Sequence, residues 1–292
     1  MGDGLLDRWA LLEEHRAEVQ ALREATKVED DQALLAFLRA SGFDEAVAAE
    51  RLAATGAWRA QRRLEEMLHD ANWSAKERAM RHVLLYDYLG LDHYGRPVLV
   101  ERMGTWAVQK VVEATEDLEE FSGVHVMADE ILAQMERPEG ALDPRGFSLI
   151  IDLDGLSARH IRPHLASVFG AISRIDEEHY PDTVAHIFVV NAPFIFWALF
   201  AMIRPFLNED TLTKVHFSQE VPEDMVSHLG ADCLPQELGG SRRLEGRADP
   251  FQCKASGSWL QASERVFMSC LALGKCFCVF VPAAVRCGYF SI

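Results

Sequence analysis

The stretch Phe188–Leu207, FVVNAPFIFWALFAMIRPFL, joins a short apolar run to an apolar helix through Asn-Ala-Pro. No charged side chain occurs between His186 and Arg204. Pro193 suits the first turn of a helix, where its fixed φ fits and its missing N–H is not needed. A bilayer-spanning helix needs about 20 apolar residues. Because Asn-Ala-Pro interrupts this run, it predicts a strand followed by a helix rather than a transmembrane segment.

The predicted helix is apolar on every side, which allows two interpretations. Such a helix is either buried in a protein core or faces something apolar that is not protein. The second interpretation is a helix that lines a cavity filled by lipid. Exposing an acyl chain to water costs about 0.8 kcal/mol per CH₂, so a soluble carrier must offer a comparable apolar lining. Periodicity alone leaves both interpretations open.

The segments on either side predict an α/β fold. The run Phe147–Leu153, FSLIIDL, reads as a buried strand, and residues 160–178 read as a helix that leads to the buried strand His186–Val190. After the apolar helix, Lys214–Phe217 reads as another short strand. Alternating strands and helices predict a mostly parallel sheet with right-handed crossovers.

The first half of the chain predicts helices and then a hairpin. Helical patterns cover residues 5–26, 31–40 and about 45–68, with Gly42 as a C-cap and Asp44 as an N-cap. Ser74 and Glu77 have the spacing of a capping box that would open another helix. Two extended runs flank HYGRP, residues 93–97, and a long helical stretch is expected from about Val108 to Arg137.

Composition limits the partners. The chain has 292 residues and a formal net charge of -16, which argues against nucleic acid because phosphate contacts need clustered Lys and Arg. It argues equally against binding an anionic bilayer by charge alone. The N-terminal residues do not have the pattern of a secretory signal. We expect a cytoplasmic monomer with no cofactor, no metal and only transient, apolar membrane contact.

The six cysteines indicate free thiols rather than a metal site. Four of them crowd the last two dozen residues, with one C-x-C and no paired C-x-x-C. A redox or acylation role for this tail stays open. Residues 242–292 form an apolar, Cys-rich tail that we expect to be poorly ordered, with packing against the preceding domain or contact with a membrane as alternatives.

Five motifs, read in order, resemble the Sec14-like (CRAL-TRIO) family of lipid-binding and lipid-transfer proteins. They are LLAFLRASGFD, DHYGRPVLVERMG, IIDLDGLS, the long run from HYPDTVAH to LTKVHF, and LPQELGG, and together they span about Asp31 to Gly240. The resemblance implies a helical N-terminal unit (residues 1–73) and an α/β lobe with an apolar lipid pocket (residues 74–241). It also implies that the protein is not an enzyme.

The resemblance also assigns roles to residues. The helix Pro193–Leu207 would be a mobile gate, with acyl chains contacted by Phe194, Phe196, Trp197, Phe200, Ile203 and Phe206. Positions that bind phosphatidylinositol in the family fall on Asp182, Thr211 and Lys214, with Arg39 as a further basic residue. Asp182 replaces the usual Glu, and Thr183 replaces a basic residue that often follows it. Phe147 and Leu149 occupy positions where binding of phosphatidylcholine needs hydroxyl groups.

Several alternatives remain. Asp182 and Lys214 can simply form a salt bridge. The guest can be a retinoid, a tocopherol or a squalene-like molecule, or the pocket can serve a regulatory module that presents a surface to a partner. The D-x-D-G of IIDLDG resembles the nucleophile motif of haloacid-dehalogenase phosphotransferases, although Leu156 stands where those enzymes have Thr. His160 and His164 are four residues apart but have no third metal ligand nearby.

Overall fold

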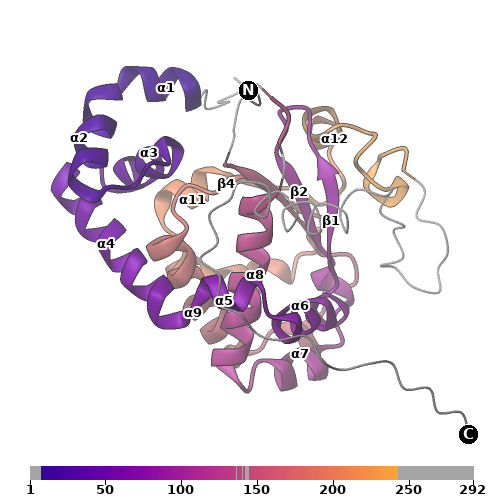
Figure 1. The fold of residues 1–292 in the computed structure, drawn as a ribbon. Helices are drawn as coiled ribbons and strands as arrows, with labels where there is room; N and C mark the ends of the chain where they lie inside the picture. The colour runs from indigo at the N-terminus through magenta and orange to yellow at the C-terminus, as the bar shows by residue number, and fades with distance from the viewer. Residues whose placement is uncertain (1–7, 136, 140, 142–144, 243–292) are drawn as a thin grey trace, which may run out of the picture. The chain divides into compact units, whose positions relative to one another are not determined.

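A computed structural model describes residues 8–135, 137–139, 141 and 145–242, all of which belong to one compact unit. Five strands form one sheet in the order β1-β2-β3-β4-β5 (Figure 1). β1 pairs with β2 in antiparallel fashion, and every other pair is parallel. The predicted mostly parallel sheet is therefore confirmed. The strands are Tyr86–Leu91, Pro97–Glu101, Phe147–Asp152, Val184–Val190 and Val215–Phe217.

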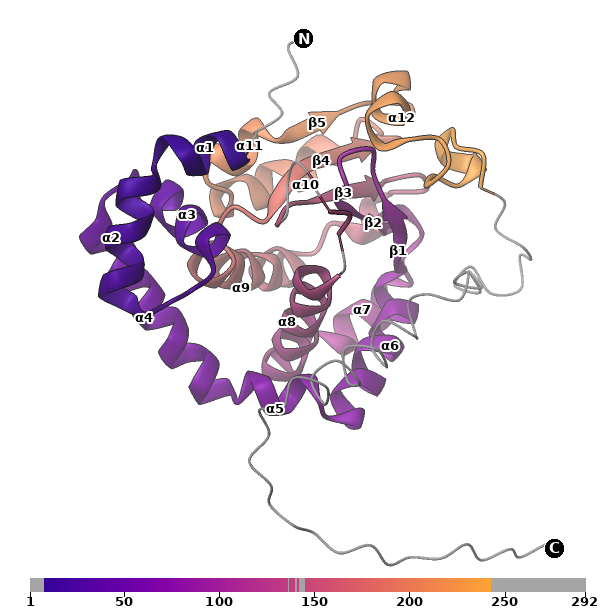
Figure 2. The same cartoon turned by 45° about the horizontal axis from the view of Figure 1, so that its top comes forward.

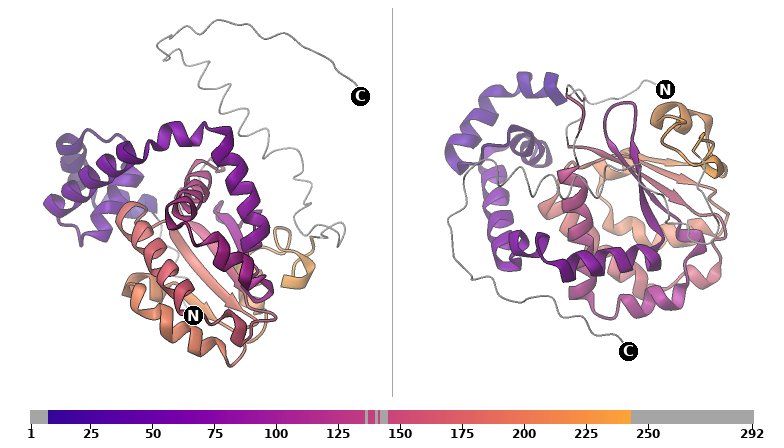
Figure 3. Two further views of the ribbon diagram at one scale, coloured as in Figure 1. Left: turned by 90° about the horizontal axis from the view of Figure 1, so that it is seen from below. Right: turned by 45° about the vertical axis from the view of Figure 1, so that its right-hand side comes forward.

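One face of the sheet is covered by a solid apolar layer. Side chains alternate between the two faces of a strand, so Phe188 and Val190 of β4 point to this face together with Ile150 of β3. They pack against Met225 and Leu229 of α12 (Glu223–Leu229). Figures 2 and 3 show α12 and the segment after it on one side of the sheet, with α8 and α9 on the other.

The opposite face is covered by four helices, two of which precede β3 in the chain and two of which follow it. They are α7 (Val108–Ala114), α8 (Leu118–Gln134), α9 (Pro163–His179) and α10 (Phe196–Ile203). The helix predicted from Val108 to Arg137 is therefore two helices. The break is explained by Asp117, whose carboxylate accepts a hydrogen bond from the backbone N–H of Glu120 and starts α8.

Four N-terminal helices form their own small core beside α9 (Figure 1). The Asp44 side chain caps α4 as predicted, accepting hydrogen bonds from the N–H groups of Ala46 and Val47. The indole of Trp58 on α4 stacks on the His179 ring of α9, with 3.9 Å between ring centroids. These helices are α1 (Arg8–Glu14), α2 (Arg16–Thr26), α3 (Asp31–Ala40) and α4 (Glu45–Arg62).

Two helix boundaries differ from expectation. The helix predicted to reach Leu68 is interrupted at Arg63, which has a left-handed φ of 55° and separates α4 from α5 (Leu64–Leu68). The helix α6 (Ala71–Leu84) begins after Asp70 rather than at Ser74. The Asp70 carboxylate caps the helix and its carbonyl accepts the N–H of Ser74, which lies inside the first turn. The boundary between residues 73 and 74 thus falls within α6, and the three-part division stays a prediction.

None of the helices in the described ranges is long and apolar enough to cross a bilayer. Cys233 is a buried free thiol. The predicted Cys-rich tail lies outside the described residues, except for Arg242.

Three histidines meet on the sheet face that α12 covers. The His186 ring on β4 lies 4.4 Å from the His228 ring and 5.5 Å from the His216 ring, between centroids. The Arg96 guanidinium lies 2.9 Å from Nε2 of His228. Burial lowers the pKa of His186, and the neighbouring Arg96 and the other two histidines lower it further, to about 3. The folded protein therefore holds His186 neutral well below the usual histidine pKa.

We predict that His186 makes the protein sensitive to acid. Between about pH 6.5 and pH 3 the unfolded chain binds a proton at this histidine and the folded chain does not, so stability falls as the pH falls. In His186→Gln this loss is absent. Urea unfolding at pH 7 and pH 4.5 should show a smaller fall in the free energy of unfolding for the variant than for wild type. The exposed His69→Gln is the control, and an equal fall in all three proteins contradicts the assignment.

Candidate functional site

A cavity of about 640 Å³ lies between the sheet and the helices on the face opposite α12. Its size is within the range of about 300–1,000 Å³ that is typical of ligand pockets. The lining is mostly apolar and includes alternate side chains of β3 and β4 together with residues of α10. They include Leu149, Ile151, Ile187, Val189, Phe196 and Leu199.

One side of α10 closes this cavity. Phe196, Phe200 and Ile203 line it, together with Phe206 from the 3-10 helix that follows α10. The Phe206 ring packs closely over Gly170 of α9, where an added Cβ would lie 2.6 Å from the ring. A glycine at this position therefore lets the chain after α10 approach α9.

The other side of the same segment faces outward. Phe194 is 90% exposed and Trp197 is 48% exposed, and neither lines the cavity. In this structure neither residue is part of the cavity wall, and the contact with acyl chains expected of them stays a prediction. Phe194 precedes the first turn of α10, and Trp197 is rotated by about 100° from the inward-facing Phe196. The apolar helix thus has one side toward the cavity and one side toward solvent.

A cluster of ion pairs lies at another part of the cavity wall and is centred on Asp182. The Asp182 carboxylate is 2.9 Å from the Arg8 guanidinium and 3.3 Å from Nζ of Lys214, and it also pairs with Arg39. Nζ of Lys214 is in turn 2.7 Å from the Asp210 carboxylate. Asp182 has a left-handed φ of 57° directly after Tyr180-Pro181, and this turn presents its side chain to three cations.

The charges of this cluster determine the protonation of Asp182. Burial raises the pKa of this carboxyl group, but the positive charges of Arg8, Arg39 and Lys214 have the larger combined effect. The pKa of Asp182 is therefore below its ordinary value, and the group is a carboxylate at neutral pH. Among the described residues, the cluster brings three cations together with two carboxylates.

The four residues predicted to bind a head group come together in space. Arg39 of α3, Asp182, Thr211 of α11 (Glu209–Thr213) and Lys214 all line the cavity. The salt bridge between Asp182 and Lys214, given as an alternative, is present. Sequence reasoning missed Arg8 and Asp210. Asp210 could have been found from its i,i+4 spacing to Lys214, whereas Arg8 is 174 residues from Asp182.

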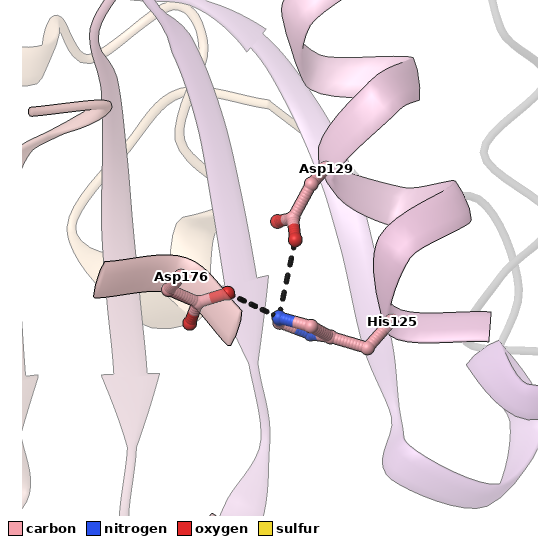
Figure 4. A group of neighbouring side chains, drawn as sticks. All are labelled: His125, Asp129 and Asp176. Atoms are coloured by element: carbon pink, nitrogen blue, oxygen red, sulfur yellow. Dashed lines mark hydrogen bonds and ion pairs between the residues drawn. The ribbon is translucent and has the colours of Figure 1, made fainter. Parts of the chain in front are cut away.

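A second polar group lies inside the apolar cavity (Figure 4). Nε2 of His125 on α8 is 2.6 Å from the Asp176 carboxylate of α9 and 3.1 Å from the Asp129 carboxylate of α8. Glu101, at the end of β2, also lines this region. Burial lowers the pKa of His125, but Asp129 and Asp176 raise it to about 10. Burial raises the pKa of Asp129 to about 8 and that of Glu101 to about 7, against the opposing charge of His125.

Sequence reasoning missed this second group. His125 and Asp129 have an i,i+4 spacing that places both on one side of a helix, which is a signal that could have been read. The two histidines considered from the sequence, His160 and His164, have other partners. The backbone N–H of Ser157 donates to Nδ1 of His160, and Nε2 of His164 is 2.9 Å from the Thr115 hydroxyl.

The D-x-D-G motif has a structural explanation. The Asp152 carboxylate accepts hydrogen bonds from the Asn191 amide, at 2.8 Å, and from the backbone N–H of Asp154, at 3.0 Å. Gly155 has a φ of +86°, which favours glycine. At the other end of the same strand, Phe147 and Leu149 both line the cavity without hydroxyl groups.

Comparison with known proteins identifies similar chains. A family described as the CRAL/TRIO domain matches residues 82–240. The Sec14 cytosolic factor of Schizosaccharomyces pombe is 28% identical over 242 residues, which cover 81% of this chain and 83% of the relative. The phosphatidylinositol/phosphatidylcholine transfer protein SFH7 of Arabidopsis thaliana is 26% identical over 219 residues, which cover 73% of this chain but only 40% of the relative.

A solved structure shares the fold. The crystal structure of Sfh5 has a TM-score of 0.59 and 15% sequence identity, and the match covers 83% of this chain and 81% of that chain. At this identity the similarity establishes the arrangement of helices and strands and nothing further.

We predict that Asp182→Asn destabilises the fold. The substitution removes a carboxylate that pairs with three cations, among them Arg8, whose side chain is 2% exposed. Removing one partner of a buried ion pair costs about 3–5 kcal/mol. Because the pKa of Asp182 is lower in the folded protein, this stabilisation is present above the unfolded pKa and is lost as the pH falls below it.

Urea unfolding at pH 7 measures the loss of stability in Asp182→Asn. The control Asp154→Asn, at an exposed position, should change the free energy of unfolding by less than about 0.5 kcal/mol. A similar small change in Asp182→Asn would refute the central role of this carboxylate.

Proposed function

The chain belongs to the CRAL/TRIO domain family, and from this premise we propose that it encloses a single phospholipid and exchanges it at membrane surfaces. The family is one of lipid-binding and lipid-transfer proteins rather than enzymes, in agreement with the sequence analysis. The observation that carries the proposal is the cavity itself, whose mostly apolar wall includes a cluster of charged side chains. Acyl chains would contact the apolar wall, and a charged head group would contact the cluster.

The cluster around Asp182 favours an anionic head group. Among the described residues it gathers three cations and two carboxylates, in a chain whose net charge is -16. A phosphodiester carries one negative charge, and Lys and Arg bind phosphate through charge-assisted hydrogen bonds. Thr211 adds a hydroxyl group at the same part of the wall. We propose phosphatidylinositol as the guest, since the hydroxyl groups of inositol can donate to Asp182 and Asp210.

An uncharged guest is the second candidate. Nζ of Lys214 already contacts two carboxylates, so this ammonium is compensated without any ligand. A retinoid, a tocopherol or a squalene-like molecule would then fill the apolar part of the cavity alone. Native mass spectrometry of the protein purified from its own host separates the two candidates by the mass of the lipid that co-purifies. A neutral lipid in place of a phospholipid would refute the head-group assignment.

We predict that Lys214→Ala weakens loading of phosphatidylinositol. One charge-assisted hydrogen bond contributes about 1.5–3 kcal/mol, which corresponds to a loss of affinity of about tenfold to a hundredfold. Extraction of labelled phosphatidylinositol from liposomes measures the effect, and loading with a neutral lipid should change little. Lys110→Ala, on the exposed side of α7, is the matched control. Equal extraction of phosphatidylinositol by wild type and Lys214→Ala would contradict the assignment of Lys214 to the head group.

The outward side of the α10 segment suits contact with a bilayer. Phe194 and Trp197 are large and exposed, and Phe194 lies just before the helix that closes the cavity whereas Trp197 lies on it. Aromatic residues insert readily at the membrane interface, where the apolar part of the ring leaves water. We propose that this side of the segment contacts the membrane when lipid enters or leaves, and that α10 moves as the gate.

We predict that Phe194→Asp/Trp197→Asp reduces lipid transfer between vesicles at least tenfold and leaves the fold intact, because both side chains are exposed. Phe196→Asp, at a position that is only 4% exposed, should instead destabilise the protein. Val47→Asp, at an apolar residue 43% exposed on α4, is the control for surface charge. Thermal unfolding and a fluorescent transfer assay give the two readouts. Unchanged transfer by the double variant would exclude this segment as the contact surface.

A further inference from the structure

The group formed by His125, Asp129 and Asp176 is not explained by the enclosure of an amphiphile. Most of the cavity wall is apolar, and these three side chains place one imidazole and two carboxylates within it. They come from two helices: His125 and Asp129 from α8, and Asp176 from α9 (Figure 4). Polar groups inside an apolar cavity are costly unless they have partners.

The hydrogen bonds within the group do not satisfy it. Both carboxylates approach the same nitrogen of His125, as Figure 4 shows. An imidazole nitrogen carries at most one hydrogen, and hydrogen-bond geometry is met only with Asp176. Oδ2 of Asp129 is buried and has no hydrogen-bond partner among the described residues, although it is 3.1 Å from the nitrogen. This oxygen is therefore the atom of the group that the hydrogen bonds leave open to a metal ion.

The arrangement of the three atoms fits a metal ion. One ligand atom from each side chain lies within 4.8 Å of the other two. In a metal shell with bonds of about 2.0–2.2 Å, neighbouring ligand atoms are about 3.0–3.5 Å apart, so small rotations of the side chains suffice. The i,i+4 pair on α8 places two ligands on one side of a helix, and α9 supplies the third.

We propose that His125, Asp129 and Asp176 bind one divalent first-row transition-metal ion inside the cavity. Imidazole nitrogen suits Zn²⁺ and Fe²⁺, and carboxylate oxygen suits Mn²⁺ and Mg²⁺, so the mixed set selects the borderline ions Mn²⁺, Fe²⁺ and Zn²⁺. Glu101, at the end of β2, lines the same cavity.

The site leaves coordination positions open toward the cavity. Three protein ligands are fewer than the four or more that these ions require. All three side chains line the cavity, so the remaining positions face the space that the guest occupies. A water molecule or an oxygen atom of the guest completes the shell there. This last step rests on the proposed function, whereas binding of the metal does not.

Titration of the full chain with Mn²⁺, followed by electron paramagnetic resonance, tests the site. Mn²⁺ is the preferred probe because it favours oxygen and nitrogen over the thiolates of the Cys-rich tail. Wild type is expected to bind one Mn²⁺, and Asp129→Asn/Asp176→Asn should bind it at least tenfold more weakly. Asp154→Asn, with the same change at an exposed position, should bind as wild type does. Equal binding by wild type and the double variant overturns the proposal, because Mn²⁺ is then held elsewhere on the acidic surface.

A measurement on wild type guards against a variant that fails to fold. Bound Mn²⁺ broadens the nuclear magnetic resonance signals of nearby protons, so the ring signals of His125 should disappear at one equivalent. Those of the exposed His69 should stay sharp. Loss of both sets of signals at the same concentration, or of neither, contradicts the site. The measurement needs no lipid, so its result is independent of whether the protein transfers phosphatidylinositol.

Discussion

The architecture depends on a sheet whose two faces are both apolar but are covered in different ways. On one face, α12 and the segment after it pack directly on Phe188 and Val190. On the other, Ile187 and Val189 look into a cavity of about 640 Å³. Apolar side chains of a strand are stabilised when other groups remove them from water. Direct packing on one face stabilises the sheet, so the other face can border a cavity. Helices α8, α9 and α10 surround that space instead of filling it.

Charge is distributed in the cavity at two separate places. Around Asp182 three described cations meet two carboxylates, whereas around His125 one imidazole meets two acidic side chains. A long amphiphile in this cavity would meet two polar regions separated by apolar wall. The cluster at Asp182 also joins α1, α3 and the residues near α11, so it links the N-terminal helices to the lobe while it forms part of the wall.

Local patterns predicted much of the fold and part of the site. α3 was predicted from residue 31 to 40, and the cap at Asp44 and strands β3 and β4 also follow from short-range signals. Asp70 and Ser74 can each cap a helix that begins near residue 70, and the sequence pattern does not favour Asp70 over Ser74. An all-apolar helix has no periodicity to orient it, so the outward positions of Phe194 and Trp197 could not be read. Arg8 and Asp182, and His125 and Asp176, meet only through the tertiary fold, which one sequence does not encode locally.

The exposure of Phe194 and Trp197 on a chain with a net charge of -16 has a consequence for adsorption. Proteins that hold membranes through basic patches detach as salt rises, because ions screen the attraction. In the proposed contact, the long-range force between this acidic protein and an anionic leaflet would be repulsive, and only the apolar contact would be attractive. Added electrolyte should therefore strengthen adsorption. Zwitterionic leaflets should be preferred over those rich in phosphatidylserine, so surface potential would bias which compartments such a carrier visits.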